Sequence, residues 1–239
     1  PEAKVGTLNS KFKFFHEWKR LNEEDDEGSV AFETMLLGMC DRANFMDLFE
    51  NFILFDHSNG KVVKILARNH QFLGVNQAFE NYKARKFKNG KLGVFWHTQG
   101  SGKTALAAFS NRIMKDYYAK KDINARFFFV VDRLDLLRQA SLEFKSRGLN
   151  VVNCNSKAEF TKELNKSLST SKDEKSTGEI CVVNIQKFEG SMPEAKNDYG
   201  ANVQRIFFVD EAHRSHYGLE NKYIGIEIQK LKIVNILIQ

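Results

Sequence analysis

Seven consecutive residues have the types and order needed to hold a nucleotide phosphate: Thr98, Gln99, Gly100, Ser101, Gly102, Lys103 and Thr104. The two glycines let the backbone curl, so that successive N–H groups can point at one cluster of oxygens. A helix beginning near Lys103 would add the partial positive charge of its N-terminus. Lys103 would then reach the β- and γ-phosphates, and the Thr104 hydroxyl would ligate Mg²⁺. These residues predict a phosphate-binding loop.

This loop departs from the general pattern G-x-x-x-x-G-K-[ST] at one position, where His97 stands in place of the first glycine. The alternative interpretation is a chance Gly-Ser-Gly-Lys string in a surface turn. The apolar run at residues 92–96 before the loop and the helical pattern after it are the context that a phosphate-binding loop requires. The context favours the phosphate site.

A second candidate site is Asp210-Glu211, directly after the predicted strand at residues 205–209. Carboxylates at the C-terminal end of a buried parallel strand lie at the edge where ligands bind in such sheets. Asp210 is placed to hold Mg²⁺, and Glu211 to orient and deprotonate an attacking water. Alone, the pair could be a polar strand end or a helix cap. Together with the upstream loop it predicts a hydrolytic site in which Lys103, Asp210 and Glu211 are catalytic.

The elements that must position these residues alternate along the chain. Continuous apolar runs, typical of strands covered on both faces, occur at residues 92–96, 127–131, 151–152, 180–183 and 206–209. Segments of helical character lie between them at residues 105–118, 134–144 and 158–168. This alternation predicts an α/β fold with a parallel sheet covered by helices and right-handed crossovers.

The flanking segments have different patterns. From Phe32 to about Phe55, apolar residues at three- and four-residue spacing predict a helical segment, with Ser29 as its N-cap. The acidic residues 23–28 and the polar residues 169–178 predict surface loops, and Asn59-Gly60 predicts a turn. The closing run at residues 231–238 is compatible with a buried strand, a helix face or a remodelled end.

Composition bounds the class of protein. The chain has 239 residues, 42% of them hydrophobic, enough for one sizeable core or one core with a small satellite. The net charge of +6 permits a polyanionic partner, but no dense basic block occurs, and solvated surface charge explains it equally well. Three scattered cysteines predict neither disulfides nor a metal site, which favours the cytoplasm. No apolar run is long enough for a transmembrane helix. The N-terminus has neither a signal peptide nor a Met, which predicts a piece of a longer chain.

Five strings together resemble the motor (restriction) subunit of type I restriction–modification enzymes, which is similar to superfamily 2 helicases of the DEAH type. They lie at residues 96–104, 210–215, 67–71, 130–136 and 184–188, and the likeness runs from about residue 5 to residue 218. The resemblance implies a RecA-like domain that couples the hydrolysis of ATP with Mg²⁺ to translocation on double-stranded DNA. It also implies methyltransferase and specificity subunits as partners.

The resemblance assigns roles to further residues. Gln71 matches a glutamine that reads the adenine edge, as an amide can; the alternative is a surface helix residue. Arg133 and residues 186–187 match motifs that face the DNA backbone. Arg133 could equally pair with Asp132 or Asp135.

The resemblance also divides the chain. Residues 1–58 would be a helical segment linking to a nuclease domain, residues 59–218 an incomplete first motor domain, and residues 219–239 a tail unlike the family. No third helicase motif and no second domain with its catalytic arginines follow, so we expect the isolated chain to be inactive or weakly active. Two alternatives remain open. One is a general DEAH-type helicase, and the other is a nucleotide-binding or assembly module without turnover of its own.

Overall fold

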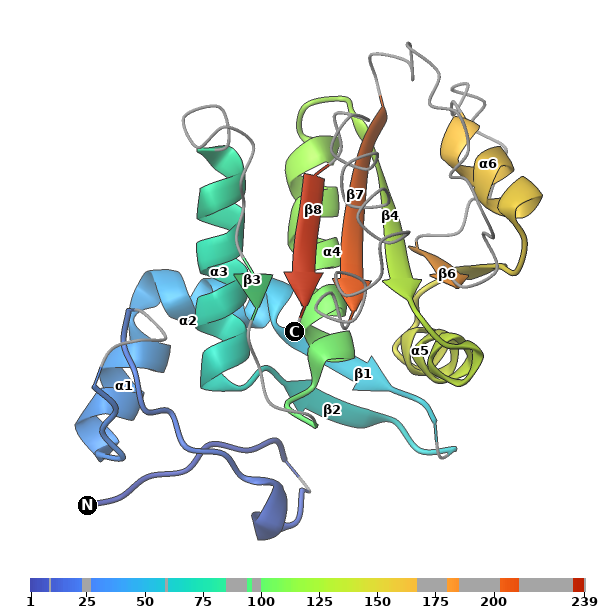
Figure 1. The fold of residues 1–239 in the computed structure, drawn as a ribbon. Coiled ribbons are helices and arrows are strands. Elements are labelled where there is room, and N and C mark those ends of the chain that lie inside the picture. The colour runs from blue at the N-terminus through green and yellow to red at the C-terminus, as the bar shows by residue number, and fades with distance from the viewer. Residues whose placement is uncertain are drawn as a thin grey trace.

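The computed structural model describes residues 1–8, 10–22, 27–58, 60–84, 94–95, 100–166, 180–184, 203–210 and 234–238. In this part of the chain a six-stranded sheet runs in the order β3-β8-β7-β4-β6-β5, with every neighbouring pair parallel (Figure 1). Its strands are β3 (Val94–Phe95), β4 (Asn124–Val131), β5 (Val151–Cys154), β6 (Ile180–Asn184), β7 (Val203–Asp210) and β8 (Val234–Ile238). The predicted α/β fold with a parallel sheet is confirmed.

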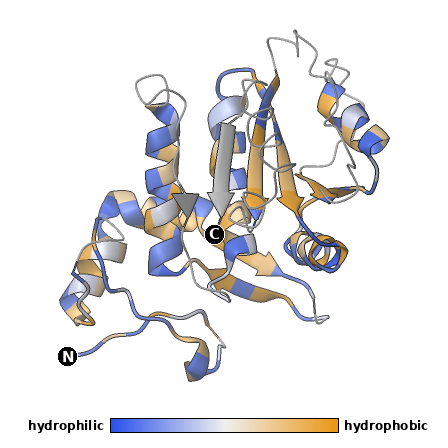
Figure 2. Cartoon of the chain, viewed as in Figure 1, coloured by the Kyte–Doolittle hydropathy of each residue, from blue (hydrophilic) through white to orange (hydrophobic). Residues whose placement is uncertain are grey.

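Helices cover both faces of this sheet. They are α3 (Asn69–Lys83), α4 (Lys103–Ala119), α5 (Leu134–Ser146) and α6 (Lys157–Asn165). Along β4, Phe127 and Phe129 pack in one core with α3, α4 and α5, whereas Phe128 packs in the other with α6. Because successive side chains of a strand point to opposite faces, burial on both sides explains the uninterrupted apolar run. Figure 2 shows this as continuous hydrophobic colour along the carboxyl-terminal part of β4 and the middle of β7.

The N-terminal part holds two helices where the sequence predicted one helical segment. A short 3₁₀ turn, η1 (Phe12–Phe14), precedes α1 (Phe32–Cys40) and α2 (Arg42–Asn51). Asp41 interrupts the helical conformation between α1 and α2. Its carboxylate accepts hydrogen bonds from the N–H groups of Ala43 (3.0 Å) and Asn44 (3.3 Å) and so caps α2. The predicted N-cap Ser29 is wrong. The residue preceding α1 is Ala31, and the Ser29 hydroxyl instead accepts a hydrogen bond from the Ala31 N–H.

A hairpin that was not predicted connects this part to α3. Its strands, β1 (Ile53–Asp56) and β2 (Val63–Leu66), pair antiparallel, and Gly60 in the connection has φ 68°. A positive φ suits glycine, in agreement with the turn predicted at Asn59-Gly60, although residue 59 lies outside the described residues. The hairpin leads directly into α3 and therefore helps to position that helix.

One hydrophobic core joins the N-terminal part to the sheet. Trp18 packs against Phe72 of α3 at 5.4 Å between ring centroids, and Phe52 contacts both Phe72 (4.8 Å) and Phe109 of α4 (5.4 Å). These residues belong to the same cluster as Phe127 and its neighbours in the sheet. The core is therefore continuous across residue 58, and the domain boundary placed there stays a prediction.

The remaining predicted elements differ mainly at their ends. Residues 234–238 form β8, so of the three interpretations of the closing run the strand is confirmed. Helix α6 ends at Asn165, three residues earlier than predicted, where the chain turns at Lys166. The predicted polar loop at residues 169–178 lies outside the described residues, as do residues 23–26 of the acidic stretch. No helix in the described part of the chain is long and apolar enough to cross a membrane.

The three cysteines differ sharply in access to solvent. Cys40 is exposed at the end of α1, whereas Cys154 and Cys181 are buried on neighbouring strands with their sulfurs 2.8 Å apart. The hydrogen bond with Cys154, together with burial, raises the pKa of the Cys181 thiol. Because the thiolate is the reactive form, we expect the folded protein to react with a thiol reagent such as DTNB at Cys40 alone.

A titration of the thiols checks this expectation. Cys40→Ser should remove the native reaction entirely, and all three thiols of the original chain should react in concentrated guanidinium. Rapid labelling of a second thiol in the folded protein would contradict the burial of the pair on β5 and β6.

Candidate functional site

Two predicted motifs meet at one edge of the sheet. Strand β8 lies between β3 and β7, and its residue Ile238 is in register with both Phe95 and Asp210. The carboxyl end of β3, from which the chain runs toward the phosphate-binding loop, is therefore level with Asp210 and two strand spacings away, about 10 Å. Ligands bind at this edge of parallel α/β sheets. The strand order thus brings together two motifs more than 100 residues apart.

The described part of the loop has the conformation that phosphate binding requires. Gly100 and Gly102 have φ values of 79° and 91°, in the left-handed region that favours glycine. Helix α4, 17 residues long, begins at Lys103, as predicted. Gly102 precedes it and supplies no side-chain cap, and the N-terminus of such a helix is a place where anions bind. Within the described chain, the buried Ser101 hydroxyl has no hydrogen-bond partner, so it too could serve a phosphate oxygen.

Other predicted site residues are placed in part. Lys103 and Thr104 form the first turn of α4 and are half-buried. Asp210 is the last residue of β7 and is also half-buried. Thr98 and Glu211 lie outside the described residues, so their predicted roles rest on the sequence alone.

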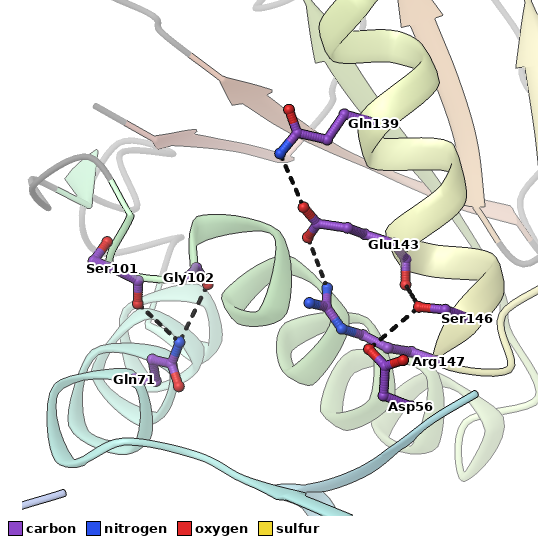
Figure 3. A network of polar contacts seen from close by, with 8 residues as sticks. All are labelled: Asp56, Gln71, Ser101, Gly102, Gln139, Glu143, Ser146 and Arg147. Carbon is purple, nitrogen blue, oxygen red and sulfur yellow. Dashed lines mark hydrogen bonds and ion pairs between the residues drawn. The ribbon is translucent and has the colours of Figure 1, made fainter. Parts of the chain in front are cut away.

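Gln71 lies against the loop, buried between α3 and α4 with 4% of its surface exposed. Its Nε2 donates to the carbonyl oxygens of Ser101 and Gly102, both at 3.2 Å, and its Oε1 accepts from the Arg68 N–H at 2.9 Å (Figure 3). A Cβ at Gly102 would stand 2.6 Å from Nε2, so this contact also requires a glycine there. The alternative of a surface residue is therefore wrong, while the adenine role stays a prediction.

The hydrogen bonds of Gln71 constrain that role. A primary amide has two N–H hydrogens, and here its nitrogen lies within hydrogen-bond distance of two loop carbonyls. A glutamine that pairs with adenine through both N6 and N7 uses one of these hydrogens for N7. Gln71 can pair in this way only after one loop carbonyl is released. In the present arrangement its amide holds the loop in place.

His70 is a contact of the loop that the sequence analysis missed. Its Nε2 lies 3.3 Å from the Ser101 carbonyl oxygen, which only an N–H can satisfy. The string at residues 67–71 includes His70, but the sequence predicted no hydrogen bond from it to the loop. Its position next to Gln71 was the signal that could have found it.

The carboxyl edge also carries polar groups on the neighbouring strands. Val130 of β4 is in register with Val209, and Val131 with Asn184, the last residue of β6. Asn184 is 1% exposed, and Asp132 follows β4 directly. A row of polar side chains thus continues along the edge beyond Asp210.

The predicted contacts to the DNA backbone are placed only at Arg133. Its guanidinium makes two hydrogen bonds to Asp135, from Nε to Oδ1 at 3.1 Å and from Nη2 to Oδ2 at 2.6 Å. The bond from Arg133 lowers the pKa of the Asp135 carboxyl. Both side chains are largely exposed, so this local pairing contributes little to stability and leaves the arginine at the surface. Residues 186–187 lie outside the described residues.

A second polar network fixes the hairpin to α5 (Figure 3). The His57 N–H donates to the Ser146 carbonyl at 2.8 Å, and the Ser146 hydroxyl lies 3.4 Å from the Asp56 carboxylate. Arg147 pairs with Glu143 at 3.2 Å. Burial by itself raises the pKa of Asp56, but hydrogen bonds from Ser58 and Ser146 and the charge of Arg147 outweigh it and lower the pKa. These contacts hold the hairpin, which leads into α3, against the end of α5.

Comparison with known proteins points to one class of enzyme. The family model of the SWI2/SNF2 ATPase matches residues 70–235. The endonuclease subunit of the type I restriction enzyme HindI from Haemophilus influenzae is 28% identical over 229 residues, which are 92% of this chain and 21% of that protein.

Two further relatives carry similar names. The putative MjaIXP endonuclease subunit from Methanocaldococcus jannaschii is 26% identical over an alignment of 247 residues. This alignment covers 91% of this chain and 22% of that protein. The SsaAORF53P endonuclease subunit from Staphylococcus saprophyticus is 33% identical over 132 residues, 53% of this chain and 12% of that protein. The chain thus spans about a fifth of the length of the first two relatives.

Proposed function

Since this chain belongs to the SWI2/SNF2 ATPase family, we propose that it is the ATP-binding motor part of a type I restriction endonuclease subunit. The observation that supports the proposal is the common level of Phe95 and Asp210 in the sheet, because β3 precedes the loop and β7 ends at Asp210. An anion-binding helix start beside a carboxylate is the arrangement that a phosphate with its Mg²⁺ needs. Residues 59–218 would form this motor domain, with residues 1–58 as the segment before it.

The groups around the phosphates would have different roles. The backbone N–H groups of Gly100, Gly102 and Lys103 and the hydroxyl of Ser101 would hold the phosphates, with Thr98 beside them. Lys103 would neutralise charge that develops on the β- and γ-phosphates during transfer.

The metal and the water would lie on the side of β7. Thr104 and Asp210 would hold the Mg²⁺ that arrives with ATP, and the metal would offset the negative charge of the phosphates. Glu211 would orient the attacking water and accept its proton. In the described structure Gln71 supports the loop, and adenine reading by Gln71 remains part of the proposal.

The substrate and partners follow from the relatives' names. These relatives are endonuclease subunits of type I restriction enzymes. We therefore propose that ATP turnover drives movement on double-stranded DNA before cleavage, in a cytoplasmic complex with methyltransferase and specificity subunits. The net charge of +6 suits a polyanionic track.

A second candidate is a nucleotide-binding module that turns over slowly or not at all on its own. In many such motors an arginine from outside the nucleotide-binding domain completes the site, so a nucleotide-binding domain assayed alone would turn over slowly. A general DEAH-type helicase would share the same ATP chemistry but respond to single strands.

Calorimetry with Mg-ATP, followed by turnover assays with linear duplex or single-stranded DNA, tests the proposal. We expect Mg-dependent binding of ATP and slow turnover by this chain alone. A folded chain that does not bind Mg-ATP would overturn the proposal. Stimulation by single strands alone would favour the general helicase. Rapid turnover with duplex DNA would show that no outside arginine is required.

A further inference from the structure

The first residue of α3 connects two parts of the chain that lie far apart in sequence. The Asn69 side chain is 6% exposed, and its Oδ1 accepts hydrogen bonds from the N–H groups of Lys19 (3.2 Å) and Arg20 (2.9 Å). Its Nδ2 donates to the Arg20 carbonyl at 2.9 Å. One buried amide therefore satisfies three main-chain groups of a segment with no regular secondary structure.

The next residues of the same helix hold the phosphate-binding loop. Side chains of an α-helix are about 100° apart around the axis, so Asn69 and Gln71 project about 200° apart, on nearly opposite sides. Asn69 contacts residues 19 and 20 on one side, while Gln71 contacts Ser101 and Gly102 on the other. The first turn of α3 is thus held between the N-terminal segment and the loop.

We propose that Asn69 is a positioning residue of the nucleotide site. By fixing the first turn of α3 to Lys19 and Arg20, it sets the place from which Gln71 holds the carbonyls of Ser101 and Gly102. That the loop binds a nucleotide rests on the proposed function above, whereas its contacts with Gln71 do not depend on that proposal. Because coupling between two sites is reciprocal, nucleotide binding should in turn stabilise the contact of residues 19–20 with α3.

The lengths of the two hydrogen bonds from Gln71 make the position of the loop sensitive to small movements of α3. Both bonds from Gln71 to the loop are 3.2 Å long, near the upper end of the range for N–H···O bonds, so a small displacement of α3 breaks them. Asn69→Ala leaves three main-chain groups without their partner, so the first turn of α3 loses its attachment to residues 19 and 20. The loop would then lose the support of Gln71, although no residue of the loop has changed.

Helix α3 offers a matched control. Asn76 also joins α3 to the N-terminal part, by donating from Nδ2 to the Asp47 carboxylate of α2 at 2.8 Å, but it lies more than a turn beyond Gln71. Asn76→Ala therefore removes a side-chain bond that joins the same helix to the N-terminal part at a different turn. A merely structural role for Asn69 predicts that the two variants behave alike.

The first measurement is hydrogen exchange of the nucleotide-free protein. We expect Asn69→Ala to speed exchange at the backbone amides of residues 100–106 by about tenfold, the loss of one typical hydrogen bond, and Asn76→Ala to leave them unchanged. Asn69→Asp keeps the shape and the oxygen that accepts from Lys19 and Arg20 but loses the donor to the Arg20 carbonyl, so its exchange should lie between those of the original chain and Asn69→Ala. Equal exchange of these amides in Asn69→Ala and Asn76→Ala would overturn the inference.

The second measurement is calorimetry with Mg-ATP on Asn69→Ala, Gln71→Ala and the double variant. If Asn69 acts through Gln71, each single substitution weakens binding, and the double variant binds about as Gln71→Ala does. Additive losses would contradict a role through Gln71. If the original chain binds no Mg-ATP, the proposed function fails, whereas the exchange experiment still decides whether Asn69 positions the loop.

Discussion

Lys103→Ala is expected to weaken Mg-ATP binding about 100-fold and to remove what turnover the chain has. A charge-assisted hydrogen bond contributes about 1.5–3 kcal/mol, and the upper end of this range corresponds to a factor of about 100 in affinity. The ammonium would also stabilise charge that develops during phosphoryl transfer, so turnover should fall further than affinity. Calorimetry gives the affinity, and phosphate release at saturating ATP gives the turnover.

The same helix supplies the control for this prediction. Lys115 is exposed on α4, twelve residues and about 18 Å along the axis from Lys103. Lys115→Ala removes the same charge from the same helix and should leave Mg-ATP binding nearly unchanged. Equal binding by Lys103→Ala and the original chain would contradict the assignment of residues 100–104 as the phosphate-binding loop.

Glu163→Gln is expected to lower the free energy of unfolding by about 3–5 kcal/mol, because it removes one partner of a buried ion pair. Glu163 of α6 lies 2.6 Å from the Arg126 guanidinium, and the two side chains are 8% and 5% exposed. Lys166 adds a second cation at 2.7 Å. Arg205, also buried, stands beside Arg126 on the neighbouring strand. Urea denaturation of the two proteins measures the difference.

Two further variants separate the ion pair from the helix around it. Glu159→Gln changes an exposed residue of the same helix and should have a small effect. Arg126→Met combined with Glu163→Leu replaces the pair by apolar side chains and should recover much of the loss. If Glu163→Gln lowers the free energy of unfolding no more than Glu159→Gln does, the result would contradict the stabilising role of the buried ion pair.

The pH dependence of the same variants gives an independent check. Burial by itself raises the pKa of Glu163, but the bond and charge of Lys166 and the charge of Arg126 outweigh it, so the pKa is lowered. A carboxyl whose pKa is lower in the folded state stabilises the protein above its unfolded value, about 4.3. That contribution is lost as the pH falls through the folded value. The difference in free energy of unfolding between the original chain and Glu163→Gln should therefore become smaller below about pH 4.

Local patterns in the sequence determined most strands of the sheet and the backbone of the described loop residues. The run Phe127–Phe128–Phe129 predicted a strand with both faces buried, and the core on each side of β4 confirms it. The loop was predictable for a similar reason, because Gly100 and Gly102 permit backbone angles that other residues resist. Such signals lie within a few residues of one another, so they can be read without knowing the fold.

Only the tertiary structure decided which distant residues meet. The insertion of β8 between β3 and β7 sets Phe95 level with Asp210, and neither strand's own pattern specifies its neighbour. The contacts of Gln71 with the loop and of Asn69 with residues 19–20 span about 30 and 50 positions. Strand order and such contacts depend on how whole elements pack, because burial is non-directional and many partners would satisfy one apolar face equally well.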